Sequence, residues 1–308
     1  MADERGYHAP VMVAEVLEYL KPERGGLYFD GTLGGGGHTE AILRTGAAAR
    51  VIGVDQDREA LEVAGLRLEP YGDRVELVNA NFADAAEAET RPLSGALLDL
   101  GVSSHQLDEG GRGFSFRAGT PLDMRMAAVE AAPTAADLLN DWPESDLADV
   151  FYRYGEERRS RRLAAAVVRR RAEQPFRTSD DLNEVLDRFY GPRITVQDRA
   201  RIYQALRIAV NDELAVLERA LVALRERLES AGVFVVLSYH SLEDRIVKDA
   251  FREWSRDCVC PPELPVCRCR GAALGRTLTR KPVMAGEEEV AENTRARSAR
   301  LRAWKKAV

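Results

Sequence analysis

The sequence has few cysteines, few aromatic residues and no long hydrophobic run, and these shortages exclude several classes of protein. Cysteine occurs at 4 of 308 positions, which is too few for a disulfide-rich secreted protein of this length. The purely apolar stretches are very short, and 233–237 has the length of one strand, whereas a membrane-spanning helix needs roughly 20 apolar residues. The first residues are acidic and no apolar segment follows, so we expect no signal peptide, no membrane contact and a cytoplasmic location.

The charge of the chain is acidic overall but unevenly distributed. The net charge of −6 argues against a general affinity for nucleic acids such as DNA, because phosphate binding depends on Lys and Arg. Two stretches are nevertheless strongly basic: Arg158, Arg159, Arg161, Arg162, Arg169, Arg170 and Arg171, and Arg295, Arg297, Arg300, Arg302, Lys305 and Lys306. An acidic protein with basic patches fits a specific polyanionic partner, although solvated helix or strand faces would also explain each patch.

The first hundred residues alternate between strand and helix patterns. Apolar runs predict strands at 27–30, 51–55, 75–78 and 96–100, and helical spacing predicts helices at 39–44 and 58–68. This alternation is typical of an α/β fold with a doubly wound parallel sheet. The next convincing strand, 233–239, begins on the order of 130 residues after the fourth strand, whereas a crossover connection between parallel strands needs only about a dozen residues.

A helical insertion fills this gap. We expect helices at 134–140, 144–154, 158–173 and 179–189, with Thr134 and Ser179 as N-caps. The predicted domains are therefore an α/β domain of residues 1–112 and 212–308 and an inserted helical domain of residues 113–211. Leucines from Leu214 to Leu228 predict a further helix that Gly232 ends. Two late strands are expected near Leu278 and Arg300.

Three features at successive strand ends predict an adenosine-containing cofactor. A glycine-rich turn, 30–38, follows the first strand, where nucleotides lie in such sheets. Asp55 ends the second strand and can accept hydrogen bonds from a ribose, and Phe82 follows the third strand, where it can pack against adenine. A tight structural loop and a core phenylalanine would explain two of these features as well. The turn lacks Gly-Lys-Ser or Gly-Lys-Thr, which excludes a P-loop, and leaves NAD and S-adenosylmethionine as alternatives.

Seven motifs carry a resemblance to a known family. They are DGTLGGGGHT (30–39), LLDLGVSSHQLD (97–108), RGFSF (112–116), PLDMRM (121–126), YGEER (154–158), SYHSLEDR (238–245) and GEEEVAEN (286–293). The chain resembles the RsmH (MraW) family from His8 to Arg302. The resemblance implies a class I S-adenosylmethionine-dependent methyltransferase, which is a Rossmann-like fold. It also implies methyl transfer to N4 of the cytosine at position 1402 of 16S rRNA in the small ribosomal subunit.

The resemblance also assigns cofactor contacts residue by residue. The positions that match are Gly36, Gly37, His38, Asp55, Phe82, Asp99 and Gln106. His105 departs from the family pattern, in which Pro or a small residue precedes the glutamine. The segment after the fourth strand begins Asp99-Leu100-Gly101-Val102, not the Asp or Asn followed by Pro-Pro and an aromatic that many amino-methylating enzymes carry, so we assign no catalytic proton acceptor.

Several further residues are candidates for substrate contacts. Phe114 and Phe116 follow the fourth strand and could stack on an unpaired base, although packing against the insertion would explain them too. Arg125, in the PLDMRM motif, joins them as a candidate. Tyr239 and His240 lie at the end of the fifth strand, where a structural histidine is an equally good explanation of His240.

Four cysteines lie close together near the C-terminus. Cys258, Cys260, Cys267 and Cys269 could bind Zn²⁺ tetrahedrally, but zinc sites usually have two residues between paired cysteines. Reduced thiols are the favoured alternative, and a cytoplasmic location disfavours a disulfide.

Two other functions remain open at this point: an NAD-dependent oxidoreductase, and a non-enzymatic ribosome assembly factor that keeps a cofactor-binding fold.

Overall fold

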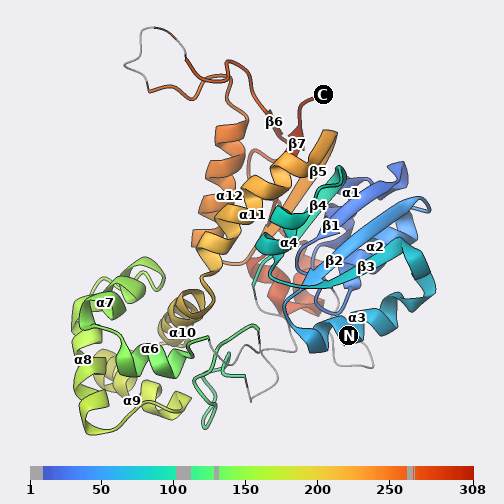
Figure 1. Ribbon diagram of the computed structural model, residues 1–308. Coiled ribbons are helices and arrows are strands. Elements are labelled where there is room, and N and C mark those ends of the chain that lie inside the picture. Colours follow the sequence, from blue (N-terminus) through green and yellow to red (C-terminus); the bar gives the residue numbers. More distant parts are fainter. Residues whose placement is uncertain (1–9, 102–111, 128–131, 262–265, 267) are drawn as a thin grey trace. The chain divides into compact units, whose positions relative to one another are not determined.

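The protein consists of two compact units (Figure 1). The computed structural model describes residues 10–101, 112–127, 132–261, 266 and 268–308. The α/β unit comprises Met1–Gly101 and Leu214–Val308, and the helical unit comprises Val102–Glu213. The insertion expected from the sequence, 113–211, falls inside the helical unit.

The α/β unit is built on a mixed sheet. Its strands are β1 (Gly26–Asp30), β2 (Ala49–Asp55), β3 (Val75–Asn79), β4 (Leu93–Asp99), β5 (Leu228–Ser238), β6 (Gly275–Thr277) and β7 (Arg300–Lys306). They lie in the order β3-β2-β1-β4-β5-β7-β6. The first five are parallel, as predicted, whereas β7 is antiparallel to both β5 and β6. The alternation in the first hundred residues thus predicted the parallel part of the sheet, and the two late strands, predicted without a direction, form the edge that contains the antiparallel pairs.

Helices cover both faces of the sheet (Figure 1). One face carries α1 (Val13–Leu20), α2 (Gly37–Thr45) and α3 (Arg58–Leu68), and the other carries α4 (Phe82–Ala88), α11 (Glu213–Arg227) and α12 (Ser241–Trp254). Strand side chains alternate between the two cores, so that Phe234 packs on one face and Val235 on the other. This is the Rossmann-like architecture that the family resemblance implies. The predicted end of the leucine-rich helix is wrong, because α11 ends at Arg227 and Gly232 lies inside β5.

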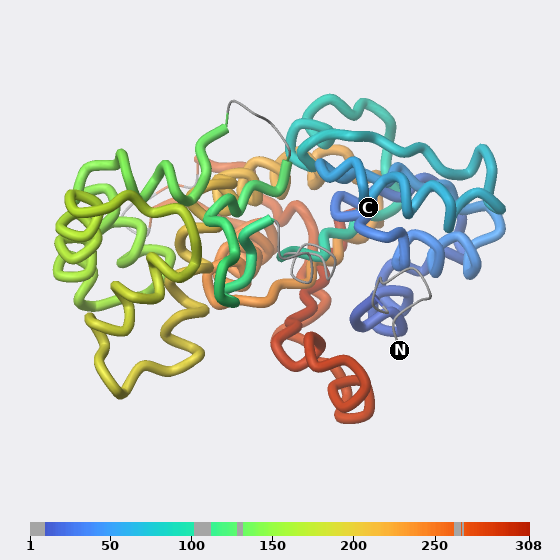
Figure 2. Tube along the Cα trace, turned by 90° about the horizontal axis from the view of Figure 1, so that it is seen from below, coloured from blue at the N-terminus to red at the C-terminus, as the bar shows by residue number. Residues whose placement is uncertain are grey.

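The C-terminal part of the α/β unit folds back beside the N-terminal helix. Figure 2 shows the red segment that contains α13 (Glu287–Glu292) near the blue α1. The backbone N–H of Met12 donates to Oε1 of Glu289 at 2.6 Å.

Short 3₁₀ turns occupy η1 (Pro22–Arg24), η2 (Glu69–Arg74), η3 (Gly191–Arg193) and η4 (Thr294–Ser298). In the described part of the chain, no helix has both the length and the apolar character needed to span a membrane.

The helical unit has its own core. Its helices are α6 (Ala135–Asp141), α7 (Glu144–Arg153), α8 (Ser160–Glu173), α9 (Ser179–Tyr190) and α10 (Val196–Asn211). Thr134 caps α6 as predicted, in a reciprocal box with Asp137. The predicted cap of α9 is wrong by one residue, because Thr178 forms the box and the buried Ser179 hydroxyl donates instead to the Arg117 carbonyl. The fifth helix, α10, was not among the predicted helices.

Candidate functional site

Three neighbouring parallel strands end in an aspartate at the same edge of the sheet. Asp30 ends β1, Asp55 ends β2 and Asp99 ends β4. β1 pairs with β2 on one side and with β4 on the other, so the strand order reverses here. In open α/β sheets, ligands bind outside the carboxyl ends of the strands at such a point. The fold thus places the three carboxylates where a cofactor is expected.

The glycine-rich turn between β1 and α2 borders this edge with backbone conformations that favour glycine. Gly34 has φ +51° and Gly36 has φ +80°. A β-carbon at Gly36 would meet Leu68 at 3.2 Å, whereas one at Gly34 would meet nothing within 4 Å. Gly36 is therefore required by backbone and packing together, while Gly34 faces open space in which a ligand can approach the backbone closely.

Asp55 connects this turn to β2. Its Oδ2 accepts a hydrogen bond from the Gly34 N–H at 2.8 Å, and its Oδ1 accepts one from the Asp57 N–H at 2.9 Å. Burial raises the pKa of Asp55 to about 6, although both hydrogen bonds act to lower it. Each carboxylate oxygen has two lone pairs, so one acceptor position on each oxygen remains for a pair of ribose hydroxyls.

Asp30 holds the start of the turn from within the core. It is almost fully buried, and its carboxylate accepts hydrogen bonds from the Thr39 hydroxyl at 2.7 Å and from the Thr32 N–H at 3.2 Å. Burial raises the pKa of Asp30, while the charge of His38 and these hydrogen bonds lower it. The Thr32 hydroxyl accepts from the Asp99 N–H at 2.6 Å, which fastens the turn to β4. Asp30, Thr32 and Thr39 were not predicted as site residues, and the bond between Thr32 and Asp99 joins positions 67 residues apart that no local pattern connects.

The side chain of His38 is buried between the start of α1 and Asp99. Its Nε2 donates to the Val11 carbonyl at 2.8 Å, and its Nδ1 lies 3.7 Å from Oδ2 of Asp99. Gly37 and His38 form the first turn of α2, whose N–H groups have no partner within the helix. A helix N-terminus is suited to bind anionic groups. We therefore expect Gly37 and His38 to contact a cofactor through their backbone.

Two further residues lie at the open edge. Phe82 opens α4, beside Gly31, and is partly buried against the core. Asp99 accepts a hydrogen bond from the Tyr239 hydroxyl at 2.7 Å. Burial raises the pKa of Asp99, and the charge of His38 and the Tyr239 hydrogen bond oppose this rise. Gln106 and His105 lie outside the described residues.

His240 has a structural role at the start of α12. Its Nδ1 accepts a hydrogen bond from the Glu243 N–H at 3.4 Å, and Oε2 of Glu243 accepts from the His240 N–H at 3.3 Å. This reciprocal arrangement is a capping box. The cap accounts for His240 without a substrate, so a substrate contact stays a prediction.

The predicted base-stacking residues belong to the helical unit, where packing accounts for them. Phe114 is buried in the core of this unit, and Phe116 packs edge-on against Tyr203 with ring centroids 5.8 Å apart. Arg125 forms an ion pair with Asp123 at 2.7 Å. None of these positions is shown to contact a substrate, and their roles remain predictions.

The basic segment of the helical unit divides into structural and exposed arginines. Arg170 is buried and pairs with Asp181 at 3.0 Å and with Glu184 at 3.2 Å. Arg171 donates to the Leu139 and Trp142 carbonyls. The expectation that both belong to a basic surface patch is therefore wrong. Four arginines are exposed and have no ion pair with any described residue: Arg158, Arg161, Arg162 and Arg169.

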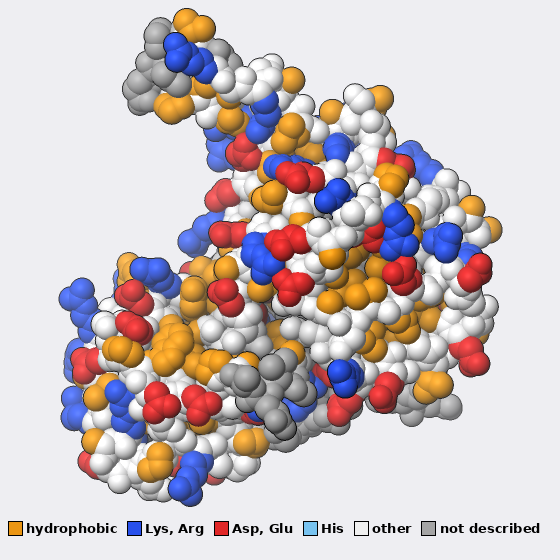
Figure 3. Space-filling model, in the orientation of Figure 1, with side chains coloured by type: hydrophobic (Ala, Val, Ile, Leu, Met, Phe, Trp, Pro, Cys, Tyr) orange, Lys and Arg blue, Asp and Glu red, His pale blue; other side chains and the backbone are white. Residues whose placement is uncertain are grey.

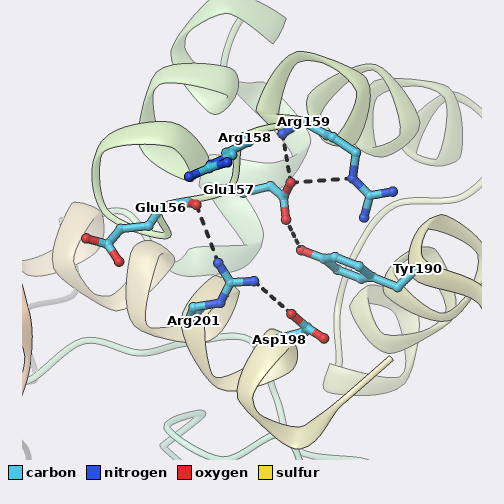
Figure 4. Close-up of a pocket in the computed structure, with 7 residues that line it drawn as sticks. All are labelled: Glu156, Glu157, Arg158, Arg159, Tyr190, Asp198 and Arg201. Carbon is cyan, nitrogen blue, oxygen red and sulfur yellow. Dashed lines mark hydrogen bonds and ion pairs between the residues drawn. The ribbon is translucent and has the colours of Figure 1, made fainter. Parts of the chain in front are cut away.

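A pocket of about 460 Å³ lies in the helical unit beside this segment. Figure 4 shows Glu157 at its centre, accepting hydrogen bonds from the Arg159 N–H and the Tyr190 hydroxyl. Arg159 lies over the Tyr190 ring at 5.1 Å, and Arg201 pairs with Asp198 at 2.7 Å. The pocket is thus lined largely by groups that satisfy one another. Arg158 and Arg159 are both exposed, but Arg159 pairs with Glu157, whereas Arg158 has no ion pair with any described residue.

The cysteines lie at the opposite edge of the α/β sheet from the aspartates. Cys258, Cys260 and Cys269 follow α12 and precede β6. Cys267 lies outside the described residues. These cysteines therefore take no part in the candidate cofactor site.

Comparisons with known proteins agree with this geometry. The model of the MraW methylase family matches residues 5–307. The chain is 52% identical to the ribosomal RNA small subunit methyltransferase H of Gemmatimonas aurantiaca, over 98% of this chain and 96% of the relative. It is 50% identical to the protein of the same name from Geotalea uraniireducens, over 97% and 98% of the two chains. This match sets aside the oxidoreductase and assembly-factor alternatives. The chain belongs to the MraW methylase family, whose members are S-adenosylmethionine-dependent methyltransferases.

Proposed function

We propose that this protein transfers a methyl group from S-adenosylmethionine to N4 of a cytosine in the 16S rRNA of the small ribosomal subunit, in the cytoplasm. The observation that carries the proposal is the hydrogen bond between the Gly34 N–H and Asp55, at the edge of the sheet where Asp99 also ends its strand, in a chain about half identical to proteins named ribosomal RNA small subunit methyltransferase H. The expected cytosine is the one that the family resemblance implies, at position 1402.

The residues at the strand ends fit an adenosine-containing cofactor. Asp55 offers one acceptor on each carboxylate oxygen, which suits the two hydroxyls of a ribose. The open space at Gly34 lets a ligand lie against the turn. Phe82 provides an aromatic side chain at the end of the neighbouring strand β3, where adenine can pack. When bound, S-adenosylmethionine supplies an electrophilic methyl group.

Positioning must provide much of the catalysis. The exocyclic nitrogen of cytosine is a poor nucleophile because its lone pair is delocalised into the ring, so the nitrogen has to be held in line with the methyl carbon. An acceptor near the amine stabilises the positive charge that develops during transfer. Asp99 ends β4 between His38 and Tyr239, and this partly buried, hydrogen-bonded carboxyl is held beside the proposed cofactor site.

An unpaired cytosine within an assembled subunit is the substrate that the charge distribution favours. The net charge of −6 gives little general attraction to RNA, so recognition has to rest on local cations and on shape. Arg158, Arg161, Arg162 and Arg169 are exposed cations that can bind phosphates. Base pairing occupies the N4 amine, so a duplex should be inert.

The test is transfer of a labelled methyl group to three substrates: intact small subunits, protein-free 16S rRNA and short oligonucleotides. We expect the intact subunit to be methylated fastest, with the label on N4 of one cytosine when nucleosides are mapped by mass spectrometry. Label on another atom would overturn the proposed reaction. Equal or faster methylation of the naked oligonucleotide would overturn the proposed substrate while leaving the reaction intact.

A further inference from the structure

We propose that Cys258, Cys260 and Cys269 form a structural zinc site in the segment between α12 and β6. Their sulfur atoms all lie within 4.8 Å of one another. The three residues come from two Cys-x-Cys pairs, and their approach brings together positions up to eleven residues apart. This site lies at the opposite edge of the sheet from the cofactor site, and the proposed methyl transfer makes no use of it.

The spacing of the sulfur atoms matches a tetrahedral metal site. The Sγ atoms of Cys258 and Cys269 are 3.8 Å apart. Zinc binds thiolate sulfur at about 2.3 Å, so two ligands of a tetrahedral zinc ion are about 3.8 Å apart. A disulfide would need a separation of about 2.05 Å. The observed distance therefore fits two sulfurs that share a metal ion and excludes a bond between them.

The backbone around the sulfurs is arranged to stabilise thiolates. The Val259 N–H donates to Sγ of Cys269 at 3.4 Å, and the Arg268 N–H donates to Sγ of Cys260 at 3.4 Å. Each Cys-x-Cys pair thus donates to a sulfur of the other pair. Such hydrogen bonds from outside the coordination shell orient metal ligands and offset their negative charge.

The described residues of the segment form no hydrophobic core that would hold the sulfurs together. Figures 1 and 3 show it projecting from the rest of the α/β unit, and none of the described residues between Arg256 and Ala272 is buried. Val266 is 67% exposed. A segment of this size with so little buried surface needs another source of stability, which a structural metal provides.

The base of the segment is fastened separately from its tip. Arg270 donates to the carbonyls of Glu253 and Arg256 and pairs with the Glu253 carboxylate at 2.8 Å. The Ala273 N–H donates to the Asp257 carboxylate. These bonds do not involve the cysteine sulfurs, so we expect the metal to hold the sulfurs together. On zinc binding each thiol releases its proton to solvent and its sulfur forms a bond to the ion.

The sulfur geometry favours zinc over hard cations. Mg²⁺ and Ca²⁺ prefer oxygen ligands, whereas thiolate sites select zinc and other soft metals. The proposal rests on the three described sulfurs. The fourth cysteine of the sequence, Cys267, lies outside the described residues and is left to the experiment.

The test is metal analysis of the full chain, purified without chelator after removal of any affinity tag. We expect about one zinc per chain by elemental mass spectrometry, and X-ray absorption with three or four sulfur neighbours at about 2.3 Å. Added to the metal-free chain, Co²⁺ should give thiolate charge-transfer and tetrahedral visible bands, which zinc then displaces. A chain that binds neither zinc nor cobalt, or binds zinc through nitrogen and oxygen alone, would overturn the proposal.

Variants separate this site from adventitious binding. The double variant Cys258→Ser and Cys269→Ser should lose the zinc and the cobalt bands. The matched control is Asp257→Asn with Glu253→Gln, which changes nearby carboxylates without removing a sulfur and should keep one zinc. Circular dichroism and binding of S-adenosylmethionine report whether each variant is folded. Full zinc content in the double cysteine variant would contradict the assignment.

Discussion

The hydroxyl of Tyr239 donates a hydrogen bond to Oδ1 of Asp99 at 2.7 Å, across the carboxyl ends of the neighbouring strands β4 and β5. The Tyr239 ring also lies 3.4 Å from the position of a β-carbon at Gly101, a residue with φ +103°. Burial and the nearby Asp99 raise the pKa of Tyr239 well above its usual value, so the hydroxyl keeps its proton and remains a donor. Tyr239 therefore holds the Asp99 carboxyl in place.

Replacement of Tyr239 by phenylalanine should destabilise the protein by about 1 kcal/mol, because a partly buried carboxyl loses its donor. The free energy of unfolding, measured with a chemical denaturant, checks this value. Tyr19→Phe is the control, since the Tyr19 hydroxyl has no hydrogen bond to any described residue. Equal effects of the two substitutions would show that the hydrogen bond to Asp99 contributes nothing specific.

The affinity for S-adenosylmethionine should fall as the pH falls through about 6. The pKa of Asp55 is raised to about 6 by burial, so the carboxylate is ionised above this pH and neutral below it. A neutral carboxyl is a weaker acceptor for ribose hydroxyls. We expect binding to be about tenfold weaker at pH 5 than at pH 7.5, which follows from the ionised fraction.

The variant Asp55→Asn tests the assignment of this pH dependence. It should bind S-adenosylmethionine about 1–3 kcal/mol more weakly at pH 7.5, and its affinity should change little between pH 5 and 7.5. Calorimetry in buffers of different ionisation enthalpy should also detect protons released when the native protein binds near pH 6. An unaltered pH dependence in the variant would assign the titration to another group.

Alanine at Gly34 should weaken cofactor binding more than it weakens the fold. The substitution strains a backbone with positive φ by about 1 kcal/mol and places a methyl group in the open space beside Asp55. Gly72→Ala is a control, because Gly72 also has positive φ and open space around it but lies in η2. Calorimetric affinity and thermal unfolding of the two variants separate the effects. Equal affinities of the two variants for S-adenosylmethionine would show that Gly34 does not belong to the cofactor site.

Neutralising exposed arginines of the helical unit should weaken RNA binding. Glutamine at Arg158, Arg161, Arg162 and Arg169 should flatten the salt dependence of RNA affinity by about 0.7 in the log–log slope for each phosphate that the variant no longer neutralises. Affinity for S-adenosylmethionine should not change. The measurement is RNA binding at several salt concentrations. An unchanged slope would show that these arginines are solvated surface residues that do not bind phosphates.

Arg170→Gln provides the contrasting case. Arg170 is buried and bonds to Asp181, Glu184 and the Gln174 carbonyl. Its replacement should destabilise the protein by about 1–3 kcal/mol, because the hydrogen bonds of a buried guanidinium are lost, while Asp181 keeps the Thr178 N–H and Glu184 keeps Arg188 as partners. The salt dependence of RNA binding by the protein that remains folded should be unaltered. A stable variant with a flatter salt slope would show that Arg170 binds RNA after all.

Local patterns in the sequence determined most of the α/β framework. The apolar runs of β1 to β5, the full extent of α3 and the cap at Thr134 were predictable, because strand alternation, helical spacing and capping depend on residues a few positions apart. The glycine-rich turn and Asp55 also predicted the edge at which a cofactor would bind, since the carboxyl ends of parallel strands must meet there.

The tertiary structure decided which of these residues contact one another. Asp99 and Tyr239 are 140 positions apart, and the antiparallel placement of β7 depends on the whole sheet. Arg169 and Arg170 are adjacent in sequence, yet one is exposed and the other buried, because successive residues of a helix point about 100° apart and packing selects the buried face. The sequence thus determined which groups are present and which elements they form, whereas long-range packing determined their neighbours, their burial and the protonation of their carboxyl groups.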